Sequence, residues 1–171
     1  MSATSLDLLS LRAKQRLASG AAAATAQQSV PAEAATDEAE CPAFGYLRGI
    51  RDRALSLEFR LASGNSRAFP YNWLGPTLYD PSAGLLLTFV GDRIYLVLLE
   101  GSNLNLLVGG ATNLFDRGIL RHRVTWVREM TRQALAKARE EEVTVERIRM
   151  VSFRPDEEHN AEWLAPFRAK D

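Results

Sequence analysis

Apolar and polar side chains alternate strictly in the stretch LSLEFRL, residues 55–61. A period of two predicts a β-strand with one face in the core and the other in water. A turn-forming stretch, ASGNS, comes next, and the aromatic stretch RAFPYNWLGPTLYD follows it. Since Pro70 and Pro76 cannot donate to a sheet ladder, this aromatic stretch is expected at a sheet edge or at bends.

Residues 85–90 and 94–100 are apolar at almost every position and predict the two strands of a hairpin. The segment GDR, residues 91–93, is a tight-turn signal between them. A strand with one solvated face would carry polar residues on that face. Both faces of this hairpin therefore need a cover. One cover is expected to be a long helix, and the other is a closed barrel interior, an N-terminal helix or a second subunit.

Residues 113–142 have a helical pattern, with Asn113 as a candidate N-cap after the loop GSNLNLLVGGATN. At about 100° per residue, an apolar arc opposes a narrow stripe of arginines. The members of this Arg stripe are Arg117, Arg121, Arg128, Arg132 and Arg139. The pattern predicts one long helix that packs its apolar arc on the sheet. A final strand is predicted within residues 143–153, VTVERIRMVSF.

Together these elements predict an α+β domain over residues 44–153. Its antiparallel, strongly twisted sheet or partial barrel follows the order β-β-β-β-α-β and is packed by the long helix. Residues 1–43 are Ala-rich and polar, which predicts a disordered tail with, at most, a short helix at 5–18. Residues 154–171 form a polar C-terminal tail, in which Trp163, Leu164 and Phe167 are candidate docking points.

The totals exclude several classes of site. The 171 residues carry a formal net charge of zero, which argues against a dedicated nucleic-acid binder. One cysteine excludes an intramolecular disulfide and a Cys-based zinc site, and two histidines exclude a His-rich metal site. No apolar run approaches the ~20 residues that span a bilayer, and no secretory signal is visible. We therefore expect a cytoplasmic protein with no membrane partner, no metal, no cofactor and no catalytic residue.

Five arginines are candidates for binding an anion or a partner: Arg117, Arg121, Arg123, Arg128 and Arg132. The plainer interpretation of the Arg stripe is a solvated helix face. Arg123 differs because it projects into the apolar arc, where an unpaired guanidinium is costly. It is expected to extend its charged end to solvent, to pair with Asp116, Glu58 or Asp92, or to bind a ligand carboxylate or phosphate between helix and sheet.

The segments LEFRLASGNSRAFPYNWLGPTLYDPSAGLLLTF and LFDRGILRHRVTWVRE together resemble a family of small bacterial proteins of uncharacterised function. The shared pattern is a strand, a Gly turn, a Pro-Tyr strand, a leucine-rich hairpin and a helix with R-V-x-W-V. The loop at 101–112 is longer here than this pattern expects. The resemblance implies no activity and no site residues.

The function expected from the sequence is a non-catalytic binding or assembly module that contacts a protein partner or a second copy of itself. The alternative is anion or nucleic-acid binding through the Arg stripe of helix 113–142. An uncovered hairpin face would form an exposed apolar patch, which monomers rarely tolerate. The candidate dimer face consists of Leu86, Tyr95, Val97 and Leu99. The competing account is a barrel-like closure within one chain.

Overall fold

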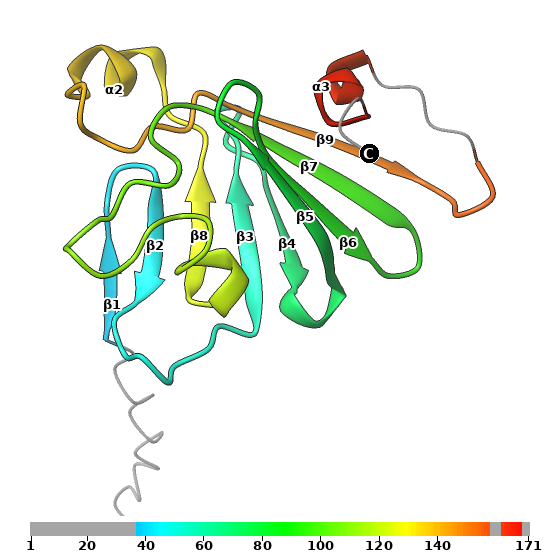
Figure 1. Ribbon diagram of the computed structural model, residues 1–171, viewed down its shortest axis with the longest axis horizontal. Helices are drawn as coiled ribbons and strands as arrows, with labels where there is room; N and C mark the ends of the chain where they lie inside the picture. Colours follow the sequence, from blue (N-terminus) through cyan, green and yellow to red (C-terminus); the bar gives the residue numbers. More distant parts are fainter. Residues whose placement is uncertain (1–36, 158–161, 169–171) are drawn as a thin grey trace, which may run out of the picture. The chain divides into compact units, whose positions relative to one another are not determined.

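The computed structural model describes residues 37–157 and 162–168, so the predicted tail up to residue 36 lies outside the described residues. The strands are β1 (Glu38–Glu40), β2 (Phe44–Leu47), β3 (Ser56–Arg60), β4 (Ser66–Pro70), β5 (Leu74–Asp80), β6 (Gly84–Val90), β7 (Ile94–Glu100), β8 (Val124–Arg128) and β9 (Arg147–Phe153). The helical elements are η1 (Tyr71–Trp73), η2 (Ile119–Arg121), α2 (Arg132–Lys137), η3 (Glu162–Leu164) and α3 (Ala165–Arg168). A five-stranded sheet has the order β1-β2-β8-β3-β4, and a four-stranded sheet has the order β5-β6-β7-β9 (Figure 1).

One apolar core lies between the two sheets. Phe59 of β3 and Phe69 of β4 place their ring centroids 6.0 Å and 4.7 Å from that of Phe89 in β6. Leu87 of β6 and Val97 of β7 are fully buried in the same cluster. The inward residues of both sheets therefore cover each other, and no long helix is needed on that side.

The predicted strand at 55–61 is confirmed as β3. Its Leu57 and Phe59 are fully buried, whereas Ser56 is exposed on the other face. The predicted hairpin is confirmed as β6 and β7, which pair from Val90 opposite Ile94 across the turn at 91–93. Pro70 and Pro76 lie in β4 and β5, the edge strands of the two sheets, as their missing N–H groups require.

The predicted helix over residues 113–142 is wrong, and so is the α+β class that depends on it. The described fold is mostly β, and its longest helix, α2, has 6 residues. The β-branched and aromatic run from Val124 to Val127 suits a pleated strand and forms β8. Gly118 lies so close to other backbone that an added Cβ would come within 2.2 Å of the Asn113 carbonyl oxygen. His122, at a left-handed φ of 54°, then ends η2 and redirects the chain into β8.

β8 occupies the middle of the five-stranded sheet (Figure 1). It pairs antiparallel with β2 on one side and parallel with β3 on the other. Opposite the step between Gly45 and Tyr46, β8 carries one extra residue, Thr125, so the ladder is bulged there. The segment expected to cover a sheet is therefore itself a central strand.

The two ends of the described chain both contribute to the domain. The strand pair β1–β2 spans the predicted boundary at residue 44. Near the other end, Leu164 and Phe167 are buried against Leu86 and Leu98 on the outer face of the four-stranded sheet. No helix in residues 37–157 and 162–168 is long and apolar enough to cross a membrane.

The four residues of the candidate dimer face do not share one surface. The register pairs Leu87 with Val97, Leu85 with Leu99, and Leu86 with Leu98. Val97 and Leu99 are therefore fully buried in the core, with Tyr95 packed beside them, whereas Leu86 lies on the opposite face. Because the turn at 91–93 has three residues, odd-numbered positions of β6 pair with odd-numbered positions of β7. The predicted face combined an even-numbered position with odd-numbered ones, so it could not form one surface.

Candidate functional site

The arginines of the predicted stripe are dispersed over several segments. Arg117 lies in the loop before η2, Arg121 in η2, Arg128 in β8 and Arg132 at the start of α2, all of them exposed. Because no single helix carries them, helical spacing does not bring them together. None of these four arginines lines either of the two hollows described below.

Arg123 is buried and bound to backbone. Its Nε and Nη2 donate to the Leu47 carbonyl oxygen at 3.0 Å and 2.7 Å, and Nη2 also donates to the Arg48 carbonyl at 2.9 Å. The predicted pairing with Asp116 is wrong, since that carboxylate accepts from the Asn113 side-chain amide. Neither Glu58 nor Asp92 bonds to Arg123. Arg123 therefore connects the start of β8 to the end of β2 through backbone carbonyl groups.

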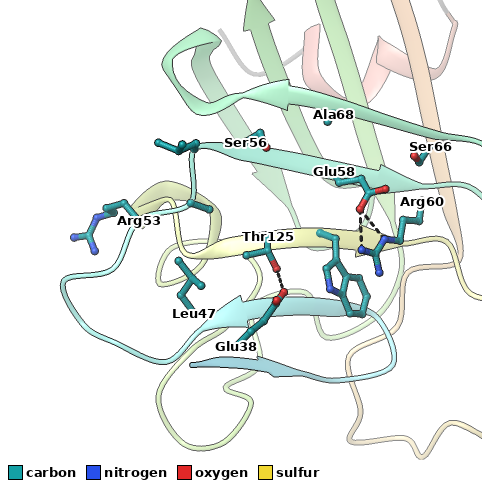
Figure 2. A pocket seen from close by; sticks show the side chains of 12 residues that line it. Glu38, Leu47, Arg53, Ser56, Glu58, Arg60, Ser66, Ala68 and Thr125 are labelled. Carbon is teal, nitrogen blue, oxygen red and sulfur yellow. Dashed lines mark hydrogen bonds and ion pairs between the residues drawn. The ribbon is translucent and has the colours of Figure 1, made fainter. Parts of the chain in front are cut away.

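A groove of about 590 Å³ lies on the outer face of the five-stranded sheet. We call it the sheet groove. Its lining comprises Glu38, Leu47, Arg53, Ala54, Leu55, Ser56, Glu58, Arg60, Ser66, Ala68, Thr125 and Trp126. Figure 2 shows Arg53 and Arg60 toward opposite ends, with Glu38, Thr125 and Glu58 between them. The groove thus crosses all five strands, β1, β2, β8, β3 and β4, with a cation at each end.

An ion pair fixes one end of the sheet groove. Arg60 donates from Nε and Nη2 to Oε2 of Glu58, both at 2.8 Å (Figure 2). Partial burial alone would raise the pKa of the Glu58 carboxyl, but hydrogen bonds from Arg60 and Ser66 and the nearby positive charges outweigh it. The pKa of Glu58 is therefore lowered, and this carboxylate stays ionised at neutral pH.

Trp126 forms a covered part of the groove floor and is only 5% exposed. The guanidinium carbons of Arg60 and Arg128 lie 4.5 Å and 4.6 Å from its ring centroid, a cation–π arrangement. A Cβ on Gly45 would come within 2.3 Å of the indole Nε1, so this glycine lets the ring lie against β2. The ring therefore contacts both guanidinium groups.

The other end of the sheet groove is formed by the loop between β2 and β3. Arg53 donates from Nη1 to the carbonyl oxygens of Ile50 at 2.9 Å and Asp52 at 2.8 Å, which orders its guanidinium. The Ala54 amide donates to the His122 carbonyl at 2.7 Å and ties the loop to the end of η2. Leu55, at the rim, is 89% exposed. The apolar side chain of Leu55 and the guanidinium group of Arg53 thus lie at the same end of the sheet groove.

The groove combines two carboxylates, two guanidinium groups and several hydroxyl groups. Between Thr125 and Glu38, a hydroxyl donates to a carboxylate Oε1 (Figure 2). In the part of the chain that the structure describes, no group of three or more His, Cys, Asp or Glu side chains could hold a metal ion. The arrangement can orient a ligand by hydrogen bonds and charge at both ends.

The sequence contained a partial signal for this site. Ser56, Glu58 and Arg60 are the solvated positions of the alternating strand, and they became one wall of the sheet groove. Trp126 was assigned to the wrong element, so its place in the floor was missed. Comparison of the chain with known protein families, with curated proteins and with solved structures finds no match.

Proposed function

We propose that the protein is a non-catalytic binding module that holds an extended segment of a partner protein in the sheet groove. One observation supports this most directly: the groove presents both signs of charge on one face of the five-stranded sheet. Glu38 and Glu58 lie between Arg53 at one end and Arg60 at the other. A polypeptide can supply partners for both signs and hydrogen bonds for the hydroxyl groups.

The same charge pattern disfavours a nucleic acid. A phosphate backbone is bound by surfaces with an excess of Lys and Arg, and two carboxylates in the groove would repel it. The alternative predicted from the sequence, binding through an Arg stripe on helix 113–142, also loses the helix on which it depends.

The dimensions suit a short extended segment. A strand rises about 3.3 Å per residue, so the wall from Ser56 to Arg60 is roughly 13 Å long and matches about four extended residues. Glu58 stays ionised and is engaged by Arg60, so it is suited to orienting a ligand rather than to transferring a proton. The backbone of β3 and β8 fixes the wall before any ligand arrives.

An NMR titration tests this function. The probes are three short synthetic peptides, with alternating Glu and Lys, with Lys alone and with Glu alone, and a single-stranded RNA. We expect the mixed-charge peptide to bind most tightly and to shift the Trp126 indole resonance. The variant Ala68→Trp fills the groove from an exposed position and should weaken binding by roughly tenfold or more.

The matched control is Ala136→Trp, which places the same side chain on an exposed position of α2, outside the groove. It should bind like the parent chain. Tighter binding of RNA than of any peptide would contradict the proposal. So would the absence of any resonance shift with all four probes, or equal losses in the two Trp variants.

A further inference from the structure

A second hollow, of about 280 Å³, lies away from the sheet groove and shares no lining residue with it. Its walls come from the β1–β2 turn, the Gly- and Asn-rich loop and the segment before β9. Leu106, Leu107, Val108 and Val143 supply apolar walls, and Glu141 and Glu142 complete the lining. We call it the acidic-rim hollow.

The hollow is held open by its own hydrogen bonds. The Asn103 side-chain amide donates to the carbonyl oxygens of Glu140 at 2.8 Å and Glu142 at 3.0 Å, which ties the loop to the acidic segment. Val108 and Thr112 form a β-bridge around Gly109 and Gly110, at φ 60° and 72°. These left-handed positions suit a tight turn that only glycine adopts readily. The walls are therefore formed before any ligand binds.

Two neighbouring leucines leave much of their surface in water at this hollow. Leu106 is 42% exposed and Leu107 is 43% exposed. Neighbouring exposed apolar side chains rimmed by charge are typical of interaction sites. At about 280 Å³, the hollow is at the small end of the range of ligand pockets and suits one or two side chains.

The negative charge at the rim indicates that a partner segment should carry positive charge. Glu142 lies 3.8 Å from Arg139, while Glu141 makes no ion pair among residues 37–157 and 162–168. The lining contains two carboxylates and no cation. A ligand that buries an apolar side chain here therefore gains from a positive charge next to it.

We propose that the acidic-rim hollow binds a basic, apolar peptide segment of a partner protein. An apolar side chain of the segment packs against Leu106 and Leu107, and a neighbouring Lys or Arg faces Glu141. This site is separate from the sheet groove, and the module can hold two segments at once.

The single cysteine of the chain reports on this site. Cys41 is half-buried in the wall of the hollow, so a bound peptide shields it from an alkylating reagent. Burial raises the pKa of the Cys41 thiol, so alkylation rates are compared at one mildly alkaline pH. The probe is a short amidated peptide in which leucines alternate with lysines. On the full chain, we expect it to slow alkylation by about fivefold or more at saturation, as direct shielding requires.

Three controls make the experiment specific. Leu107→Asp should abolish protection, whereas Leu120→Asp, at a leucine that is 45% exposed outside the hollow, should leave it intact. A peptide with glutamate in place of lysine should not protect, and Glu141→Gln should weaken protection by the lysine peptide. Ala68→Trp should change nothing here, which separates this site from the proposed function of the sheet groove.

Several outcomes would overturn the proposal. They are the absence of protection, equal protection in Leu107→Asp, or equal protection by the glutamate peptide. Protection that rises with protein concentration without any peptide would also overturn it, because the occupant would then be a second copy of the chain. Circular dichroism of each variant shows that a lost effect does not arise from unfolding.

Discussion

The two sheets share one core, but their outer faces differ in composition. On the five-stranded sheet, most outward residues are polar, and Glu58 pairs with Arg60. On the four-stranded sheet, most outward side chains are apolar, beside an ion pair between Glu100 and Arg149. Leu86 and Leu98 are buried beneath the C-terminal segment, while Leu78 and Val90 remain 47% and 53% exposed.

This difference separates binding from stability. Side chains on the polar face can be replaced without opening the core, so that face is free to vary with its ligand. The apolar face depends on a cover, since contiguous exposed apolar surface is disfavoured in water. Leu164 and Phe167 supply part of that cover. The following substitutions are ordered from the largest expected effect to the smallest.

Neighbouring residues of β7 should show the largest contrast between the inner and outer faces. Val97 is fully buried in the core, and Leu96 is half-buried on the outer face. Val97→Glu places a carboxylate in the core and should unfold the protein, a cost of about 4 kcal/mol or more. Leu96→Glu should remain folded. Circular dichroism and urea denaturation measure both, and a folded Val97→Glu would show that the face is not internal.

Arg123 stabilises the polar sheet through backbone rather than through charge pairs. Arg123→Met removes three hydrogen bonds and leaves two carbonyl groups without these donors. The free energy of unfolding should fall by roughly 3 kcal/mol. Arg121→Met, at an exposed position of η2, is the control and should be nearly neutral. Equal urea midpoints for the two variants would contradict the assigned role.

The C-terminal cover of the apolar face should have an intermediate effect. Phe167→Ala removes a ring that is 7% exposed and should lower the free energy of unfolding by roughly 2–3 kcal/mol. Leu55→Ala, on the polar face, is 89% exposed and should change it little. Urea denaturation followed by fluorescence compares the two. A neutral Phe167→Ala would mean that the segment does not stabilise the sheet.

The Glu58–Arg60 pair should contribute only about 0.5–1 kcal/mol, because it is partly exposed. The folded-state pKa of Glu58 is lowered, so its contribution is present above the ordinary carboxyl pKa and is lost as pH falls through the lowered value. Glu58→Gln should therefore be less stable than the parent near neutral pH and equally stable in acid. A stability difference that persists in acid would point to packing instead.

The smallest effect is expected at the dispersed arginines. Replacing Arg121, Arg128 and Arg132 with Gln should change the free energy of unfolding by no more than about 1 kcal/mol in total. Of the three, Arg128 should account for most of the change, because it alone lies over an aromatic ring. Thermal unfolding of the single variants tests this ranking.

The comparison of the two sheets also shows which strands could be predicted from the sequence pattern alone. β3 was predicted because its alternation reflects the pleat of a sheet, and β6 and β7 because two apolar runs flank a tight-turn signal. The run Phe44–Leu47 is buried at all four positions, so it shows no alternation and was missed. Ile119, Val127 and Met130 happen to lie at helical spacing, yet the β-branched residues around Trp126 belong in a strand.

The sheet groove required long-range pairing that spacing cannot supply. Glu38 and Thr125 are hydrogen-bonded across 87 positions of sequence. Their proximity depends on β8 entering the sheet between β2 and β3, which no local pattern specifies. The solvated face of β3 could therefore be predicted from the sequence. The residues that lie beside this face in the sheet groove could not.

The central position of β8 has a consequence for synthesis of the chain on the ribosome. The residues of β2 and β3 leave the exit tunnel long before residues 124–128, and everything that forms β5, β6 and β7 emerges in between. Until β8 arrives, the five-stranded sheet has a gap with an unpaired strand on each side. A nascent chain that pauses before residue 124 is therefore expected to expose two strand edges that can pair with other chains.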